Sequence, residues 1–229
     1  MLNYLDKERR GAKHEFMHNG DKMTQREFSK IYSKLPEPYK AELIAGIVYE
    51  PPPPSAQHGE SDSHLITLLT IYRSHTPGTQ VSNNTSVILS DQDEVQPDSC
   101  LRIRPEAGGQ SSIWRRKLKG APELVAEVSF TSRSIDLHVK KDRYAKFGVK
   151  EYIVLCVEPS FLHWHNLESG EKLPPDENGI IRSRIFPGLW IDSLALLNAD
   201  PMPALETLSL GLQSSQHKAV VDLLASRMT

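Results

Sequence analysis

The chain has very little cysteine and no cysteine–histidine pattern that would bind zinc. Only Cys100 and Cys156 occur among its 229 residues, and both lie in apolar stretches. Two cysteines cannot form a disulfide framework in a chain of this length. We therefore expect both thiols to be reduced and buried, and we expect any metal site to use oxygen ligands.

Three further absences narrow the class of protein. No run of 18 apolar residues occurs, so no transmembrane helix is expected, and residues 1–23 lack an apolar signal core. These features predict a cytoplasmic protein. The formal net charge of −2 argues against a tight non-specific DNA binder, though not against an enzyme with a locally basic groove. No G-x-x-x-x-G-K loop is present, which disfavours a hydrolase of small phosphate esters.

What remains is the composition of an ordinary globular protein, with 38% apolar and 24% charged residues. We predict a flexible N-terminal extension over 1–22, a main domain over 23–199 and a C-terminal helical extension over 200–229. A capping box of Thr24 and Glu27 begins a helix. A hairpin turns at Ala45-Gly46, and a second helix carries apolar residues at helical spacing over 65–72.

The centre of the chain predicts a β-α-β unit. "APELVAEVSF" is a strong strand, "SRSIDLHVKKDRYAKFGV" is a helix closed by Gly148, and "KEYIVLCVE" is a second strong strand. "VQPDSCLRI" belongs to an earlier strand region. We interpret "IWRRKLKG" as a basic connector that could reach phosphate, although a solvated segment is the commoner explanation. We expect the three tryptophans to pack in the core or against loops rather than to stack on bases. Together these patterns predict an α/β (α+β) fold.

Two carboxylates stand where a core is expected. Asp98 follows Pro97 inside the apolar "VQPDSCLRI", and Glu127 lies in the middle of an apolar strand. A buried ionised carboxylate costs several kcal/mol unless a cation or hydrogen bonds compensate. Asp98 is therefore either a turn residue or half of a site. Glu127 either faces water on a surface strand or belongs to the same site.

The helix after Glu127 offers a cation. Asp136, Lys140, Tyr144 and Phe147 share one face. Asp136 and Lys140 alone could be an exposed ion pair worth about 0.3–0.5 kcal/mol, but the two aromatic residues indicate that this face packs on the sheet. Two carboxylates and a lysine are the parts of a metal-dependent phosphodiesterase, with Mg²⁺ or Mn²⁺ bound by oxygen ligands and the lysine beside the attacking water.

These residues resemble those of a known family. "VQPD", followed by "APELVAEVSFTSRSIDLHVKKDRYAKFGVKEYIVLCVE", is similar to the Uma-two family of "putative restriction endonucleases" in the PD-(D/E)XK nuclease superfamily. The resemblance runs from about Thr24 to Leu197 and includes "AELIAGIVYEPPPPSAQHGE" and "GIIRSRIFPGLWID". It implies a restriction-endonuclease-like core, with a mixed central sheet flanked by helices and extra C-terminal helices.

The resemblance also assigns roles to single residues. Asp98 and Glu127 match the acidic motif residues and are expected to bind the metal. The usual lysine two positions later is Ser129 here, so the resemblance points to Lys140 on the next helix as the third catalytic residue, with Lys141 as the fallback.

Auxiliary residues and partners follow from the same resemblance. Glu42 and His58 match an acidic residue and a histidine ahead of the core, and Asp136 is expected to orient Lys140 or hold the helix start. The implied function is a Mg²⁺-dependent endonuclease that hydrolyses DNA, acting as a homodimer. The alternative is a catalytically inactive nuclease-fold module that binds DNA or a protein, which the near-neutral charge and the extra C-terminal helices favour.

Overall fold

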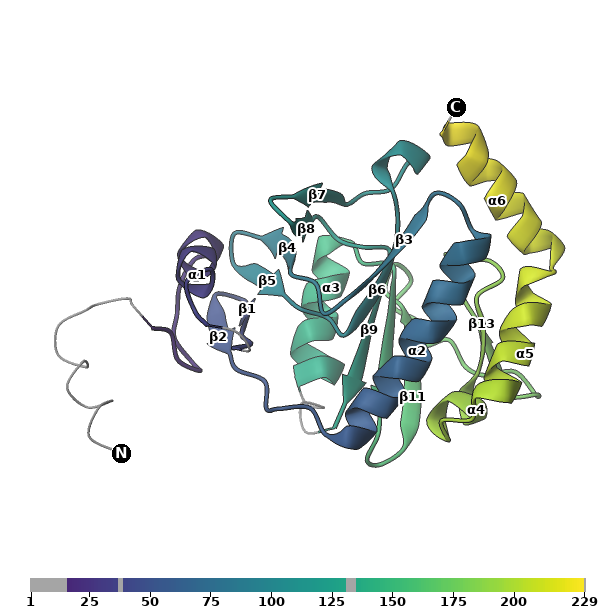
Figure 1. Ribbon diagram of the computed structural model, residues 1–229, viewed down its shortest axis with the longest axis horizontal. Coiled ribbons are helices and arrows are strands. Elements are labelled where there is room, and N and C mark those ends of the chain that lie inside the picture. The colour runs from purple at the N-terminus through teal and green to yellow at the C-terminus, as the bar shows by residue number, and fades with distance from the viewer. Residues whose placement is uncertain (1–15, 37–38, 131–134, 229) are drawn as a thin grey trace.

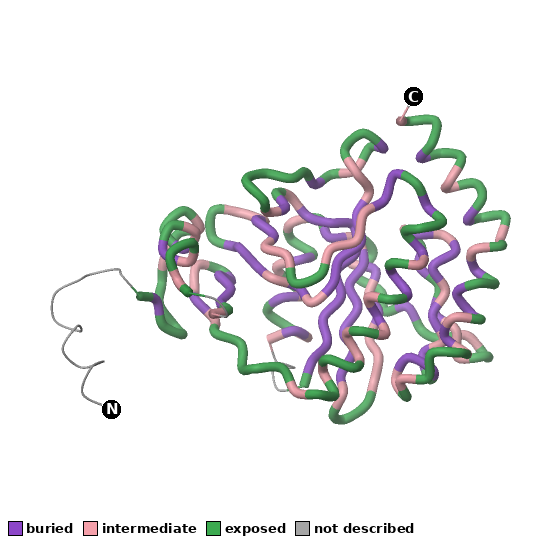
Figure 2. Tube along the Cα trace, in the orientation of Figure 1, coloured by how far each residue is buried: buried purple, intermediate pink, exposed green. Residues whose placement is uncertain are grey.

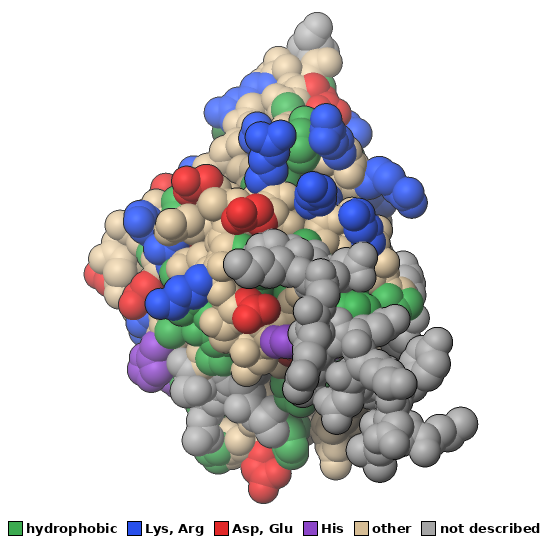
Figure 3. All heavy atoms as spheres, turned by 90° about the vertical axis from the view of Figure 1, so that its left-hand side faces the viewer, with side chains coloured by type: hydrophobic (Ala, Val, Ile, Leu, Met, Phe, Trp, Pro, Cys, Tyr) green, Lys and Arg blue, Asp and Glu red, His purple; other side chains and the backbone are tan. Residues whose placement is uncertain are grey.

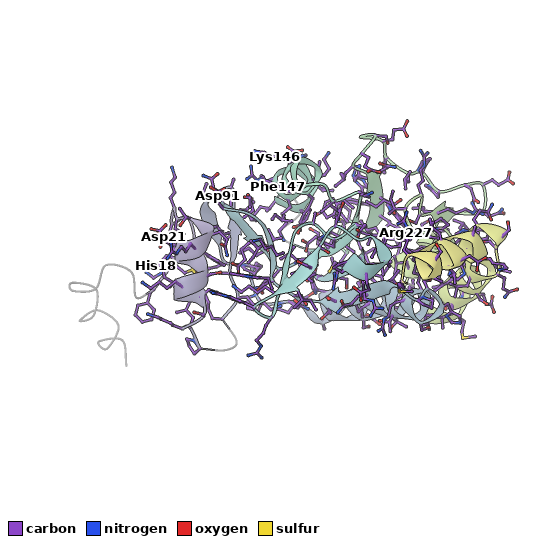
Figure 4. The ribbon with its side chains drawn as sticks, turned by 90° about the horizontal axis from the view of Figure 1, so that it is seen from above. His18, Asp21, Asp91, Lys146, Phe147 and Arg227 are labelled. Atoms are coloured by element: carbon purple, nitrogen blue, oxygen red, sulfur yellow. The ribbon has the colours of Figure 1, made fainter. Side chains whose placement is uncertain are left out.

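The computed structural model describes residues 16–36, 39–130 and 135–228 (Figure 1). Its helices and two large sheets confirm the predicted α/β class. Seen from above (Figure 4), His18 and Asp21 lie at one end of the molecule, and Arg227 lies in the opposite half. Within the described ranges, no helix is long and apolar enough to cross a membrane.

A five-stranded sheet forms the centre of the molecule. Its strands, in spatial order, are β11 (Phe161–Asn166), β10 (Glu151–Cys156), β9 (Leu124–Ser129), β6 (Ser99–Ile103) and β3 (Thr79–Asn83). β9 and β10 are parallel, as the predicted β-α-β unit requires, and the other neighbours are antiparallel. Figure 2 shows that the inner strands are buried along most of their length.

Each face of this sheet is covered by helices. The largest core cluster joins α2 (Ala56–His75), α4 (Ser193–Leu197) and α5 (Pro201–Leu212) to one face. The other face packs on α3 (Lys141–Phe147), through Tyr144. Side chains alternate along β9, so Val125 faces the α3 side while Leu124 faces α2.

A second, six-stranded sheet extends this core. Its strands, in spatial order, are β2 (Ile47–Tyr49), β1 (Glu42–Ile44), β5 (Asp93–Val95), β4 (Val87–Ser90), β8 (Lys117–Lys119) and β7 (Ser112–Trp114). α1 (Gln25–Tyr32) packs on β1 and β2 through Phe28, and its predicted capping box of Thr24 and Glu27 is present. The predicted turn at Ala45-Gly46 joins β1 to β2, with both residues at positive φ.

Two predictions about strands need correction. The stretch around Asp98 is not one strand: β5 belongs to the six-stranded sheet and β6 to the five-stranded sheet, and residues 96–98 cross between them. Pro97 has no N–H to donate, which suits the break in pairing. The basic segment "IWRRKLKG" is not a connector, because it forms most of the β7–β8 hairpin.

The helix after Glu127 also differs from a regular α-helix. Its predicted start at 131–134 lies outside the described residues, and Ile135–Lys140 forms a π-helical turn before α3 begins. Tyr152 Oη donates a hydrogen bond to the Asp136 carbonyl oxygen (3.0 Å), which gives this carbonyl a partner outside the helix. Gly148 ends α3 with φ of 92°, as predicted.

The C-terminal residues form helices, as predicted. β12 (Ile180–Arg182) and β13 (Trp190–Asp192) pair ahead of α4, and α6 (Ser215–Arg227) follows α5. Ala204 and Leu208 of α5 are part of the largest core cluster. A 3₁₀ turn at Pro105–Ala107 (η2) contacts α6. Both cysteines are reduced and buried, as predicted.

Candidate active site

Asp98 lies at the crossing between the two sheets, just before β6. Its Oδ2 accepts a hydrogen bond from the Val128 backbone N–H (2.8 Å), one residue after Glu127 on the neighbouring strand β9. Its own backbone N–H is 3.4 Å from Glu127 Oε2. The side chain keeps 15% of its surface exposed, so the carboxylate is held in place at the edge of solvent.

Glu127 and Lys140 meet in the interior between β9 and the first helical turn after it. Lys140 Nζ lies 3.0 Å from Glu127 Oε1, and the two residues are only 6% and 4% exposed. The π-helical turn ends at Lys140 and brings it back over the strand, as its predicted position on the inward face requires. π-Helical turns occur frequently at functional sites.

Two further carboxylates share the same lysine. Lys140 Nζ is 2.8 Å from Glu42 Oε2 and 3.7 Å from Asp136 Oδ1. Glu42 sits on β1 of the six-stranded sheet, where its Oε1 accepts a hydrogen bond from the Gln96 backbone N–H (2.6 Å). The lysine therefore ties both sheets and the π-helical turn together.

Burial and crowding shift the proton affinities in this cluster. Burial raises the pKa of Glu127 well above its usual value, and the carboxylates of Asp98, Asp136 and Glu42 add to the rise, against the opposing charge of Lys140. Burial alone would lower the pKa of Lys140, but the surrounding carboxylates outweigh it and hold that pKa well above its usual value. Lys140 is therefore a permanent cation in the site.

His58 approaches Asp98 from the first turn of α2. Its Nε2 is 3.3 Å from Asp98 Oδ2, and the hydrogen bond to Asp98 raises the pKa of the imidazole. Ser55 caps α2 by accepting a hydrogen bond from the His58 backbone N–H. Asp62, one turn further along α2, is 3.3 Å from Ser99 Oγ, next to Asp98 in the chain.

Sequence reasoning missed one contact and left another open. Tyr144 Oη donates a hydrogen bond to Glu127 Oε1 (2.8 Å), although the sequence suggested only an apolar role for this tyrosine. Its spacing of four residues from Lys140 was the available signal. Lys141 does not join the cluster: together with burial, its charge lowers the pKa of His165 to about 4, which places it toward β11.

The donor set suits a hard divalent cation. Lys140 contacts three carboxylates, those of Glu42, Glu127 and Asp136, and the Asp98 backbone N–H lies beside Glu127. Like charges about 4 Å apart repel by roughly 4 kcal/mol at an effective dielectric constant near 20, so a cation among carboxylates is favoured. No thiolate competes, since burial raises the pKa of Cys100 to about 12. Across residues 16–36, 39–130 and 135–228, no three His, Cys, Asp or Glu side chains form a preformed metal cage. Mg²⁺ commonly needs only one or two carboxylates and keeps several waters.

Comparisons with known proteins agree with the fold. The family profile of Uma2, described as "Putative restriction endonuclease", matches residues 26–197. A solved structure from Anabaena variabilis, a "putative nuclease belonging to DUF820", superposes with a TM-score of 0.56 over 88% of this chain and 99% of that one, at 15% identity. This likeness shows the fold alone. No curated protein matches the chain.

Proposed function

The chain belongs to the Uma2 "putative restriction endonuclease" family and has a nuclease fold, and from this premise we propose that it is a metal-dependent DNA endonuclease. The proposed reaction is hydrolysis of a phosphodiester: a water oxygen bonds to phosphorus, and the bond from phosphorus to the leaving oxygen breaks. The leaving oxygen takes up a proton, so one strand is left with a hydroxyl end and a phosphate end.

Each side chain has a distinct role in this proposal. Asp98 and Glu127 would hold Mg²⁺ or Mn²⁺, which would supply Lewis-acid activation of water when bound. Lys140 would offer its charge to the phosphate as negative charge develops there. Glu42 and Asp136 position the Lys140 ammonium, and Tyr144 fixes one oxygen of Glu127.

His58 acts through Asp98. Because Oδ2 of Asp98 is held by both the Val128 N–H and His58, the carboxylate is fixed in orientation before any ligand arrives. Preorganised groups of this kind avoid the cost of reorganisation during the reaction.

One observation carries the proposal: Asp98, Glu127 and Lys140 come from three different segments, and Glu127 contacts both of the others. Its Oε1 lies 3.0 Å from Lys140 Nζ, and its Oε2 lies 3.4 Å from the Asp98 backbone N. Each of the three residues taken alone could have a purely structural role. Their contacts with one another support a shared role in one site. The combination of perturbed pKa values and a specific charge partner is typical of functional sites.

Plasmid nicking with Mg²⁺ or Mn²⁺ tests the proposal. We expect the wild type to relax supercoiled DNA, and Asp98→Asn to lose at least 100-fold in initial rate because one metal ligand is weakened. EDTA should abolish wild-type cleavage. Equal rates for the wild type and Asp98→Asn would overturn the assignment.

A second candidate function is a nuclease-fold module that binds without cleaving. The lack of a preformed three-ligand cage among the described residues favours it, as does Lys140 being fully engaged by carboxylates. Isothermal titration with Mn²⁺ separates the two. Binding at sub-millimolar metal that is lost in Asp98→Asn supports the enzyme, and no binding supports the module.

We also propose that the enzyme acts as a homodimer, because a single site of this kind cuts one strand of a duplex at a time. Light scattering after size-exclusion chromatography, with and without DNA, measures the state directly. A monomer in both conditions would exclude this part of the proposal.

A further inference from the structure

The β7–β8 hairpin is basic and exposed. Residues 110–121 contain Arg115, Arg116, Lys117 and Lys119 and no acidic residue, although the whole chain carries a net charge of −2. All but Lys117 are exposed. Figure 3 shows Lys and Arg side chains gathered in the upper part of the face that carries α1 and this hairpin.

The hairpin tip is built at a conformational cost. Trp114 pairs with Lys117, which leaves Arg115 and Arg116 as a two-residue turn with φ of 47° and 68°. Two consecutive residues at positive φ define a type I′ turn, for which Asn-Gly is the favoured sequence. Arginine in this conformation is strained. The hairpin therefore carries two cations at its tip in spite of a less favourable backbone conformation.

An exposed aromatic ring lies directly beside these cations. Trp114 keeps 41% of its surface exposed, and the Arg115 guanidinium lies 4.6 Å from the centroid of its ring. Lys119 Nζ lies 5.6 Å from the same centroid. Trp114 is therefore available to solvent, whereas Trp164 is fully buried.

The hairpin is anchored to the rest of the molecule. Lys117 Nζ binds Glu94 Oε1 (2.5 Å), a fully buried carboxylate of β5, and also Ser29 of α1 (2.8 Å). Lys117 is thereby neutralised, while Arg115, Arg116 and Lys119 have no acidic partner among the described ion pairs. A hollow of about 680 Å³, lined in part by Lys119 and Ser112, opens next to the hairpin.

The strand order sets the distance to the candidate active site. β8 and β7 are three and four strands away from β1, which carries Glu42. At 4.7–4.9 Å per strand, this is roughly 14 to 19 Å. Half a turn of B-DNA is about 17 Å long, so one duplex can contact both places.

From these observations we infer that the β7–β8 hairpin binds the phosphate backbone of duplex DNA through Arg115, Arg116 and Lys119. The inference rests on the proposed function, since it names the surface that holds the substrate beside the Glu127 site. It favours phosphate contact, the alternative to a solvated segment, for "IWRRKLKG". The charge is complementary to phosphate, and Arg115 and Arg116 extend from a turn that projects beyond the paired strands.

The turn itself offers a decisive variant. Arg115→Asn with Arg116→Gly installs the preferred type I′ sequence, so we expect an equal or higher melting temperature. Binding to a fluorescein-labelled 30-base-pair duplex is followed by anisotropy in EDTA, from 50 to 300 mM NaCl. We expect affinity at low salt to fall roughly tenfold, and the slope of log K against log salt to fall in magnitude by about 1.8, or 0.9 for each lost phosphate contact.

A matched control removes two exposed cations elsewhere. Arg73→Ala with Lys172→Ala, on α2 and after β11, should leave affinity and salt slope at wild-type values. Equal affinity and slope for the turn variant and the wild type would overturn the inference. The same conclusion would follow if the turn variant self-associates with unchanged DNA binding, because the cations would then protect the edge strand β7 from pairing with another chain.

Plasmid cleavage by the wild type separates this inference from the proposed function. If the wild type cleaves DNA but the turn variant binds as tightly as the wild type, the nuclease assignment stands and the hairpin inference is rejected. If the turn variant binds more weakly but the wild type does not cleave, the hairpin inference stands and the nuclease assignment is rejected. A wild type that neither binds nor cleaves duplex DNA removes both.

Discussion

Two buried glutamates on adjacent parallel strands have opposite surroundings. Glu127 on β9 is 4% exposed, and Glu151 on β10 is completely buried. Glu127 contacts an ammonium and lies among three other carboxylates. Glu151 accepts four hydrogen bonds from neutral donors: Trp164 Nε1, Ser183 Oγ and the backbone N–H groups of Arg184 and Ile185.

The two glutamates also differ in position on the sheet. Glu151 begins β10, beside Leu124 at the start of β9, and lies on the face that packs against α2. Glu127 lies toward the C-terminal end of β9, on the α3 side. In α/β sheets, ligands bind outside the carboxyl ends of parallel strands. Glu151 therefore anchors the loop at 183–185, and the position of Glu127 supports the proposed site.

The comparison shows that burial alone does not identify a catalytic carboxylate. Burial raises the pKa of both glutamates. Only Glu127 combines this rise with a permanent cation and with like charges that a metal would neutralise. The difference between the two glutamates lies in their partners: Glu127 has charged partners, as expected of a candidate active site, and Glu151 has neutral hydrogen-bond donors, as expected of a structural anchor.

The same substitution at both positions tests most directly whether the two glutamates have different roles. Glu127→Gln should reduce plasmid cleavage at least 1,000-fold, because it removes a metal-binding charge. Glu151→Gln should stay within about threefold of wild type, because it touches no reacting group. Initial rates with Mn²⁺ are measured on samples whose folding is checked by near-ultraviolet circular dichroism. Similar losses in both variants would contradict the distinction.

The next largest effect concerns stability at the site. Lys140→Met leaves Glu42, Glu127 and Asp136 without their shared cation, so we expect a loss of about 3–5 kcal/mol in the free energy of unfolding at pH 7. Urea denaturation measures it. Lys141→Met, one residue away and half-buried, is the matched control and should cost under about 1 kcal/mol.

A double substitution shows whether the charges are the cause. Lys140→Met combined with Glu127→Gln removes one repelling carboxylate along with the lysine, so it should be more stable than Lys140→Met alone. If the two losses simply add, the lysine contributes through packing rather than through its charge.

Much of the fold could be predicted because its signals are local. The turn at Ala45-Gly46, the α2 helix and the β-α-β unit each follow from a pattern within a few neighbouring residues. The allocation of β5 and β6 to different sheets could not be predicted, because strand pairing joins residues far apart in the chain. The β7–β8 hairpin was missed because Arg-Arg is not a turn signal.

The candidate site was predictable to a similar degree. Asp98 and Glu127 stood out as charges in apolar surroundings, and helical spacing pointed Lys140 toward them. Glu42 emerged only through the family resemblance, because nothing in its local sequence shows that β1 lies against the π-helical turn. The hydrogen bond from Tyr144 was hidden because a tyrosine on an inward face is equally consistent with packing.

Removal of the Glu151 side chain should reduce the stability of the fold without changing cleavage. Glu151→Ala leaves the indole of Trp164, the hydroxyl of Ser183 and two backbone N–H groups without their acceptor, so we expect a loss of about 2–3 kcal/mol in the free energy of unfolding. Cleavage per folded molecule, measured well below the melting temperature, should not change. A loss of cleavage in fully folded protein would make the anchor part of the site.

The smallest expected effect is on the pH dependence of stability. Burial raises the pKa of Glu151 above its usual 4.5, so the folded state holds its proton to higher pH than the unfolded chain does. The stability that this proton provides is complete below about pH 4.5 and is lost as pH rises through the raised pKa. Glu151→Gln cannot titrate, so the fall in unfolding free energy from pH 4.5 to pH 8 should be shallower than in the wild type. Urea titrations across this range measure the slope, with the exposed Glu206→Gln as control. An unchanged slope would mean that the four neutral donors offset burial, so that the pKa of Glu151 is not raised on folding.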